Sequence, residues 1–162
     1  IIDAFAAVLG ERPDSRLVVA HSGSQTDALR QRARALGDAV TFTGTLDRAA
    51  LRDALADAEV FVSVPTSDAT SVALLQAMGA GALPVVSDLP AVREWVRDGE
   101  NGLVVPLHDS AALAAAILRA LADPSLRRAA ADANLALVEE RGLNEVNMQR
   151  MEDIYRHLAR PS

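Results

Sequence analysis

Short, unbroken apolar runs alternate with longer helical patterns along this chain, and that rhythm limits the folds that are open to it. The runs are RLVVA, AVTFTG, EVFVSVP, LPVVS and GLVVP. A strand without alternating polar residues is typical of a sheet whose two faces are both covered by helices. The pattern therefore predicts an α/β fold, a doubly wound, Rossmann-like parallel sheet of about five or six strands with helices on both faces.

Helical periodicity fills the intervals between these runs, and no repeat or linker divides residues 1–162, which are predicted to form a single domain. Asp47 is the expected N-cap of one helix. Another begins near Thr70 or Ser71. The remaining predicted helices cover 1–10, 25–36, 89–99, 109–123, 124–140 and 144–159. In the helix after Ser71 the spacing predicts a core stripe made by Val72, Leu75 and Met78.

Composition excludes several classes of chemistry. The chain has no cysteine and no lysine, so thiolate sites, lysine Schiff bases and P-loops are closed to it. Its net charge of −6 argues against a nucleic-acid partner. No apolar run approaches the roughly 20 residues of a membrane span. Three scattered histidines and no Asp-x-Asp pair predict no metal site. We expect a soluble, cytoplasmic domain.

One loop after a predicted strand gathers small polar residues. In sheets of this kind, ligands bind at the carboxyl ends of the strands. Ser67, Asp68, Thr70 and Ser71 follow such a strand and precede a helix, whose free amides and positive dipole end suit a phosphate group. Alternatively, Ser67, Asp68 and Thr70 are plain helix caps, for which these residue types are common. Both interpretations remain open from the residues alone.

Five further residues near this edge are candidates. Gln76 lies about a turn and a half into the helix, where it either reaches toward the ligand or is an ordinary surface residue. His21 follows the first strand and either touches a base or diphosphate or is simply solvated. Gly23 and Gly44 stand where a positive φ or a close backbone approach is useful, and ordinary turns explain them equally well. Thr43 precedes Gly44.

The segment VPTSDATSVALLQAMGAGALPVVSDLPAVREWVRDGENGLVVP resembles the C-terminal nucleotide-sugar-binding domain of retaining GT-B glycosyltransferases of group 1, also called family 4. In that family a polar loop precedes a helix with two acidic residues eight positions apart, followed by EAMACGLPVV and DG-NGLLV motifs. Three other stretches resemble the same domain in the same order: RLVVAHSG, VTFTGTLDRAALRDALADAEVFVSVP and NMQRMEDIYRHL. The resemblance covers nearly the whole chain.

The resemblance implies roles for individual residues. Asp68 stands at the first acidic position, which contacts hydroxyls of the transferred sugar and is the candidate catalytic residue. Ala69, Thr70 and Ser71, beside Ser67, stand where backbone amides meet the sugar and diphosphate. Gln76 replaces the second acid, the partner of the ribose hydroxyls. A neutral amide binds hydroxyls more weakly than a carboxylate does, so weaker nucleotide binding is expected.

Other implied contacts come from the neighbouring loops. The surroundings of Thr43 and Gly44 lie near the nucleobase in this family, and the loop of His21 and Gly23 faces the same ligand. The family's first strand, whose loop supplies an Arg and a Lys to the diphosphate, has no counterpart in this sequence, nor does the N-terminal acceptor domain. We therefore expect a fragment that has no transferase activity alone.

The intact enzyme is expected to transfer a sugar from a nucleoside diphosphate sugar with retention at the anomeric carbon. Helix amides and cationic groups would stabilise the leaving diphosphate without a metal or other cofactor. Its partners would be the donor and its own N-terminal domain, through which alone a peripheral membrane association would arise. The alternatives are a degenerate binding or structural module of the same fold, a sugar-nucleotide epimerase, which fits the motifs less well, and a receiver-like regulator, which lacks its acidic cluster and lysine.

Overall fold

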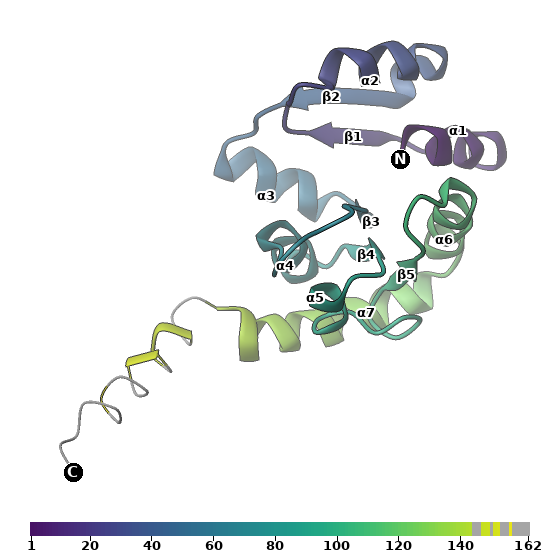
Figure 1. The fold of residues 1–162 in the computed structure, drawn as a ribbon. Helices are drawn as coiled ribbons and strands as arrows, with labels where there is room; N and C mark the ends of the chain where they lie inside the picture. Colours follow the sequence, from purple (N-terminus) through teal and green to yellow (C-terminus); the bar gives the residue numbers. More distant parts are fainter. Residues whose placement is uncertain (144–146, 150, 153–155, 157–162) are drawn as a thin grey trace.

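The computed structural model describes residues 1–143, 147–149, 151–152 and 156. Strands and helices alternate in it as predicted (Figure 1). The strands are β1 (Leu17–Ala20), β2 (Val40–Gly44), β3 (Val60–Ser63), β4 (Leu83–Ser87) and β5 (Leu103–Val105). The α-helices are α1 (Ile2–Glu11), α2 (Thr26–Ala33), α3 (Arg48–Ala56), α4 (Val72–Gly79), α5 (Pro90–Arg93), α6 (Ser110–Ala122) and α7 (Pro124–Leu137).

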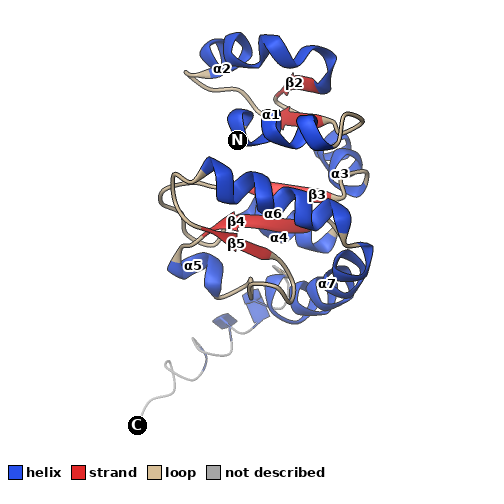
Figure 2. Ribbon diagram, turned by 90° about the vertical axis from the view of Figure 1, so that its right-hand side faces the viewer, coloured by secondary structure: helices blue, strands red, loops and turns tan. Residues whose placement is uncertain are grey.

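All strand pairs are parallel, which confirms the predicted class of sheet. Their pairing forms two sheets within the described residues: β1 beside β2, and β4 between β3 and β5. Figure 2 shows these strands stacked one after another, with helices on either side. The parallel direction brings the carboxyl ends of β3, β4 and β5 to one edge, where ligands of such sheets bind.

Successive side chains of the three-stranded sheet point to opposite faces, as the period of a strand requires. On one face, Leu83 and Val85 of β4 pack in a core built largely from α1 and α6. On the other, Val86 packs with Leu74 and Met78 of α4. Every residue of β4 is buried, so this strand is the centre of the domain.

The buried face of helix α4 differs from the predicted core stripe. Leu74, Ala77 and Met78 are its buried residues, whereas Val72 is 67% exposed. The predicted stripe of Val72, Leu75 and Met78 is therefore wrong at its first member, because the buried face is spaced three and four residues on from Leu74, with Leu75 half-buried beside it.

Helix ends follow the expected chemistry where an aspartate is available. The Asp47 carboxylate accepts a hydrogen bond from the Ala50 amide at 2.8 Å, and Asp109 accepts one from Ala112 at 2.8 Å. The Asp47 cap is as predicted. Two helices are shorter than predicted. The helix over 25–36 ends at Ala33 and continues as a 3₁₀ segment over Arg34–Ala39, and the helix over 89–99 covers only Pro90–Arg93.

The chain's last helices differ in how far they are described. Helix α7 ends at Leu137 and continues as a π-helical turn over Val138–Gly142, close to the predicted end at residue 140. Most of the predicted helix over 144–159 lies outside the described residues, although 147–149, 151–152 and 156 are helical. Among the described residues, no helix has the length and apolar character needed to cross a bilayer.

A buried polar pair shapes the turn before β5. Asn134 of α7 is fully buried and donates from its amide to the Asn101 carbonyl at 2.9 Å. The Asn101 amide donates to Asn134 Oδ1 at 2.8 Å and to the Trp95 carbonyl at 2.9 Å. Each amide thus satisfies a group that would be costly to bury alone. Asn101, in the Asn-Gly sequence of this turn, therefore has a structural role.

Gly102, the next residue, has no room for a side chain. A Cβ there would lie 2.6 Å from Val96 Cγ1 and 2.9 Å from the Pro84 side chain. We expect Gly102→Ala to lower the free energy of unfolding by about 1–3 kcal/mol, the usual cost of overpacking. Gly10→Ala is the matched control, because nothing lies within 4 Å of its Cβ position and alanine favours a helix. Urea unfolding of both variants checks this, and equal stabilities would contradict it.

Candidate functional site

The loop between β3 and α4 is fixed at its start by the neighbouring strand. Ser87, at the carboxyl end of β4, is fully buried, and its hydroxyl donates to the Pro65 carbonyl at 2.8 Å. Residues 66–70 are exposed beyond that point. The structure therefore anchors the loop at Pro65 and presents its polar residues at the edge where parallel sheets bind ligands.

Ser71 is the N-cap of α4. Its hydroxyl oxygen accepts from the Leu74 amide at 3.3 Å, and its carbonyl accepts from the Leu75 amide at 3.1 Å. The N-cap is thus Ser71 itself, and not Ser67, Asp68 or Thr70, the residues of the capping alternative. The cap leaves other donors of the helix end available, because the first amides of a helix, here those of Val72 and Ala73, have no intrahelical acceptor. Together with the dipole, these amides can bind an anion.

Asp68 lies three residues before the cap. Its Oδ1 accepts a hydrogen bond from the Ala69 amide at 2.8 Å, and both residues are exposed, as are Ser67 and Thr70. The Ala69 amide therefore already has a partner in this structure. Within the described residues the second carboxylate oxygen of Asp68 accepts no hydrogen bond, so it keeps its capacity to accept hydroxyl protons.

Gln76 is exposed on α4, four residues after Val72. Positions four apart lie above one another on the same helix face, so Gln76 and Val72 share the solvent side of α4, away from Leu74 and Met78 in the core. This placement agrees with a side chain beside the core stripe. It leaves Gln76 available to a ligand that rests on the end of α4.

The loops after β1 and β2 meet each other. The His21 amide donates to the Gly44 carbonyl at 2.6 Å, and both residues have positive φ, 76° and 70°. Of the two alternatives for these glycines, the positive φ is the one that Gly44 shows. Gly23 does not have a positive φ, and a Cβ at that position would meet no atom within 4 Å. Its amide instead donates to the Thr26 hydroxyl at 2.8 Å at the start of α2.

A cavity of about 230 Å³ opens beside this pair of loops. It lies between α2 and the first two strands, and its lining includes His21, Gly23, Leu29 and Phe42. Thr43 and Gly44 are not in the lining, and neither is any residue from 67 to 76. The predicted site residues thus form two groups at the carboxyl edge, one after β1 and β2 and one after β3.

An ion pair that sequence reasoning missed lies just after β4. Arg93 Nη2 donates to Asp88 Oδ2 at 2.8 Å, and this hydrogen bond lowers the pKa of the Asp88 carboxyl and raises the pKa of Arg93. The spacing of five residues across a strand end and a short helix gave no periodic signal. Because each charge is neutralised by the other, Arg93 is not a spare cation for a ligand.

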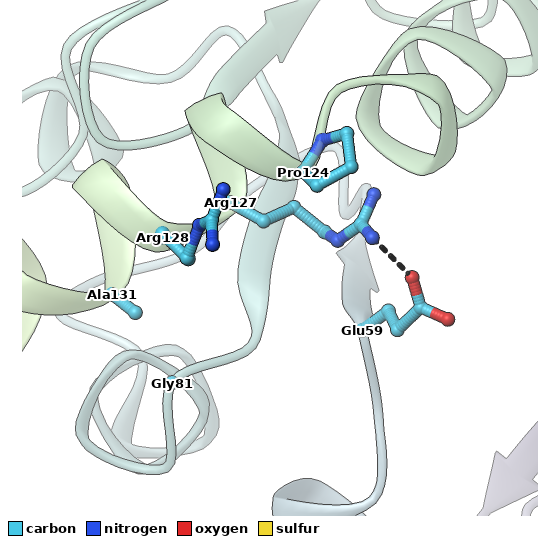
Figure 3. A pocket seen from close by; sticks show the side chains of 6 residues that line it. All are labelled: Glu59, Gly81, Pro124, Arg127, Arg128 and Ala131. Carbon is cyan, nitrogen blue, oxygen red and sulfur yellow. Dashed lines mark ion pairs between the residues drawn. The ribbon is translucent and has the colours of Figure 1, made fainter.

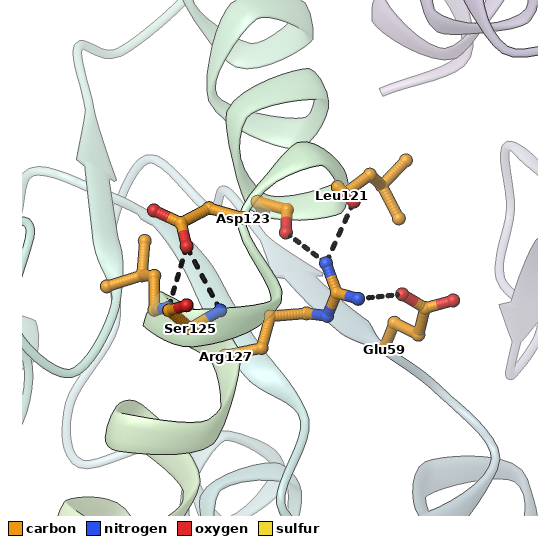
Figure 4. Close-up of polar contacts among 7 residues, drawn as sticks. Glu59, Leu121, Asp123, Ser125 and Arg127 are labelled. Carbon is orange, nitrogen blue, oxygen red and sulfur yellow. Dashed lines mark hydrogen bonds and ion pairs between the residues drawn. The ribbon is translucent and has the colours of Figure 1, made fainter.

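A second cavity, of about 340 Å³, lies at the opposite edge of the sheet (Figure 3). Arg127 lines it but is fully engaged: Nη1 donates to the Ala120 and Leu121 carbonyls at 2.6 and 2.9 Å, and Nη2 pairs with Glu59 at 2.7 Å (Figure 4). These bonds satisfy carbonyls that the end of α6 leaves without helical partners. Arg127 therefore ties α6 and α7 to the start of β3, and this role is structural.

Among the described side chains, no three of His, Asp and Glu come together as metal ligands would. The chemistry available in the loop after β3 is that of helix amides, small hydroxyls and the exposed carboxylate of Asp68, a set suited to phosphate and sugar hydroxyl groups.

Comparisons with known proteins agree on one family. Residues 1–123 match the family described as "Glycosyl transferases group 1". The phosphatidyl-myo-inositol mannosyltransferase of Mycobacterium leprae is 35% identical over 128 residues, which cover 78% of this chain and 34% of that protein. The chain thus spans about a third of the length of the curated relatives it matches.

Solved structures show the same fold. The chain superposes with a TM-score of 0.86 on a TarM variant from S. aureus in complex with UDP, at 16% identity, covering 95% of this chain and 31% of that one. The C-terminal domain of the group 1 glycosyl transferase LpcC from Francisella tularensis gives a TM-score of 0.78 at 20% identity, covering 88% of this chain and 77% of that one. These likenesses confirm the GT-B, Rossmann-like fold expected from the sequence.

The Asp88–Arg93 pair gives a pH-dependent prediction. Arg93→Gln removes the donor that lowers the Asp88 pKa, so we expect that pKa to rise toward its ordinary value. In the parent chain, the stability that the pair contributes is present above the ordinary aspartate pKa and is lost as the pH falls through the lowered one. Carboxyl ¹³C NMR titration measures the shift. Arg97→Gln is the control, since Arg97 pairs with Glu100; equal Asp88 titrations in both variants would contradict this account.

Proposed function

The chain belongs to the group 1 glycosyltransferase family, and we propose that it is the donor-binding domain of an enzyme that transfers a sugar from a nucleoside diphosphate sugar with retention at the anomeric carbon. The observation that carries the proposal is the start of α4, where exposed polar residues and the free amides of Val72 and Ala73 lie at the carboxyl edge of a parallel sheet. UDP in the TarM complex supports a nucleotide ligand for this fold.

The donor would lie along the edge with its diphosphate on the end of α4. Negative charge grows on the diphosphate as the sugar leaves, and helix amides that already point at it stabilise that charge without reorganising. Asp68 would accept hydroxyl protons of the transferred sugar, beside Ser67, Ala69 and Thr70.

The nucleoside would extend from the diphosphate toward the neighbouring loops. Gln76 would meet the ribose, and the loops of His21, Gly23, Thr43 and Gly44 would lie toward the base. In this arrangement the positive end of α4 stabilises the diphosphate, together with cationic side chains that another part of the full-length enzyme would supply, and no metal is required.

A full transferase needs more than this domain. The acceptor and the second wall of the crevice would come from an N-terminal domain of the same protein, in keeping with relatives about three times as long as the matched region. We expect the 162-residue chain to bind donor weakly and to transfer no sugar by itself.

A degenerate binding module is the second candidate. Gln76 favours it, because a neutral amide stands at a position where a carboxylate would form charge-assisted bonds to ribose hydroxyls. Calorimetric titration with UDP, GDP and ADP separates the two functions. Heat from one nucleotide supports the donor domain, whereas no heat from any of them, repeated in a longer chain that carries an N-terminal domain, supports the module.

Val72→Pro tests the helix amide directly. Proline is tolerated at the first helical position and removes only the N–H there, and Ser71 before it already has the extended backbone that proline requires (ψ 115°). We expect fold stability to be kept and affinity for the diphosphate to fall about tenfold, the worth of a hydrogen bond to a charged group. Val72→Ala, which keeps the N–H, is the control. Equal nucleotide affinities in the two variants would rule out this contact.

Gln76→Glu tests the ribose contact. We expect the carboxylate to tighten nucleotide binding by about 1 kcal/mol, roughly fivefold, because its hydrogen bonds to hydroxyls are charge-assisted. Gln31→Glu places the same charge on an exposed residue of α2 and is expected to change nothing. Unchanged or weaker binding in Gln76→Glu would show that Gln76 does not face the ribose.

A further inference from the structure

The cavity at the edge opposite the candidate site has no part in the proposed function. It measures about 340 Å³, which lies within the size range of pockets that hold small molecules, about 300–1,000 Å³. It opens where β3 begins, α4 ends and α7 begins (Figure 3). Six residues line it: Glu59, Gly81, Pro124, Arg127, Arg128 and Ala131. Three elements that are distant in the sequence therefore meet around one space of ligand size.

One wall of this cavity is made of small residues for a backbone reason. Gly81 has a φ of 88°, and its amide donates to the Met78 carbonyl at 3.2 Å, a bond that closes the end of α4. Glycine adopts this conformation without strain. A Cβ on Gly81 would lie 3.8 Å from that of Ala131. The two residues thus face each other, and neither carries a side chain that fills the cavity.

The charges in the lining do not balance. Arg127 Nη2 pairs with Glu59 at 2.7 Å, so these two charges offset each other (Figure 4). Arg128 is exposed and forms no ion pair or hydrogen bond with any residue that the structure describes, Asp132 one turn further along α7 included. The other lining residues are uncharged. The cavity therefore carries one positive charge in excess beside an apolar wall.

We propose that this cavity binds a small monocarboxylate that carries a compact apolar group. The planar guanidinium of Arg128 would donate two parallel hydrogen bonds to the carboxylate, a geometry that arginine favours. The apolar group would rest on Pro124 and Ala131 and lose its contact with water. One excess positive charge matches one negative charge, whereas a phosphate monoester brings about two, and the Glu59 carboxylate repels the surplus.

This site is distinct from the carboxyl edge. Its lining shares no residue with the loop of Ser67–Ser71 or with the cavity of His21. Helix α4 separates the two places, because Ser71 caps its beginning and Gly81 follows its end. The inference rests on the charge and size of the cavity and does not depend on the proposed donor.

Binding of isobutyrate tests the proposal, followed by backbone amide shifts in ¹H–¹⁵N NMR spectra. Isobutanol, which has the same apolar group without the charge, is the control ligand. Arg128→Gln removes the excess charge, and Ala131→Leu fills the cavity while keeping that charge. Arg119→Gln is the matched control variant, because Arg119 is an exposed residue of α6 outside the lining.

We expect isobutyrate to shift the amides of Gly81, Arg128 and Ala131. Arg128→Gln is expected to weaken this binding about tenfold, the worth of a hydrogen bond to a charged group, and Ala131→Leu to abolish it, whereas Arg119→Gln leaves it unchanged. No shift at these amides, or equal shifts with isobutanol, would overturn the proposal. Tighter binding of inorganic phosphate or UDP than of isobutyrate at the same amides would overturn it as well.

Discussion

β4 is held in parallel pairing between β3 and β5 and is buried along its whole length, and the rest of the domain depends on that burial. Its side chains alternate between the core under α1 and α6 and the core under α4. Its last residue, Ser87, turns the same strand into a support for the ligand edge by holding the Pro65 carbonyl. The same strand therefore forms the centre of the core and supports the loop of the candidate site.

Much of this architecture could be predicted because its causes are local. Unbroken apolar runs identify the strands, and Asp47 identifies a helix start because its side chain accepts a hydrogen bond from the first turn of that helix. The exposure of Val72 and the division of the strands into two paired sets arise from contacts between distant segments. The Asp88–Arg93 pair is local, but it spans a strand end and a short helix. No periodicity within one segment encodes them.

The candidate site shows the same division. Motif order identified the family and the polar loop, whereas the structure was needed to show that Ser71 is the residue that caps α4. Two contacts depend instead on loop conformation, which has no periodic pattern in the sequence. They are the hydrogen bond from the Ala69 amide to Asp68 and the contact between His21 and Gly44. The two groups of site residues therefore lie along one edge of the sheet and do not line one common pocket.

The polar loop before α4 places the nucleotide ligand of this domain at the carboxyl edge and not at the cavity of Glu59 and Arg127 on the opposite edge. Backbone amide shifts in ¹H–¹⁵N NMR spectra, recorded as UDP or GDP is added, distinguish the two edges. We expect the largest shifts on residues 69–76, with smaller ones on the loops of His21 and Gly44. Shifts centred on Glu59, Gly81 and Arg127 would contradict it.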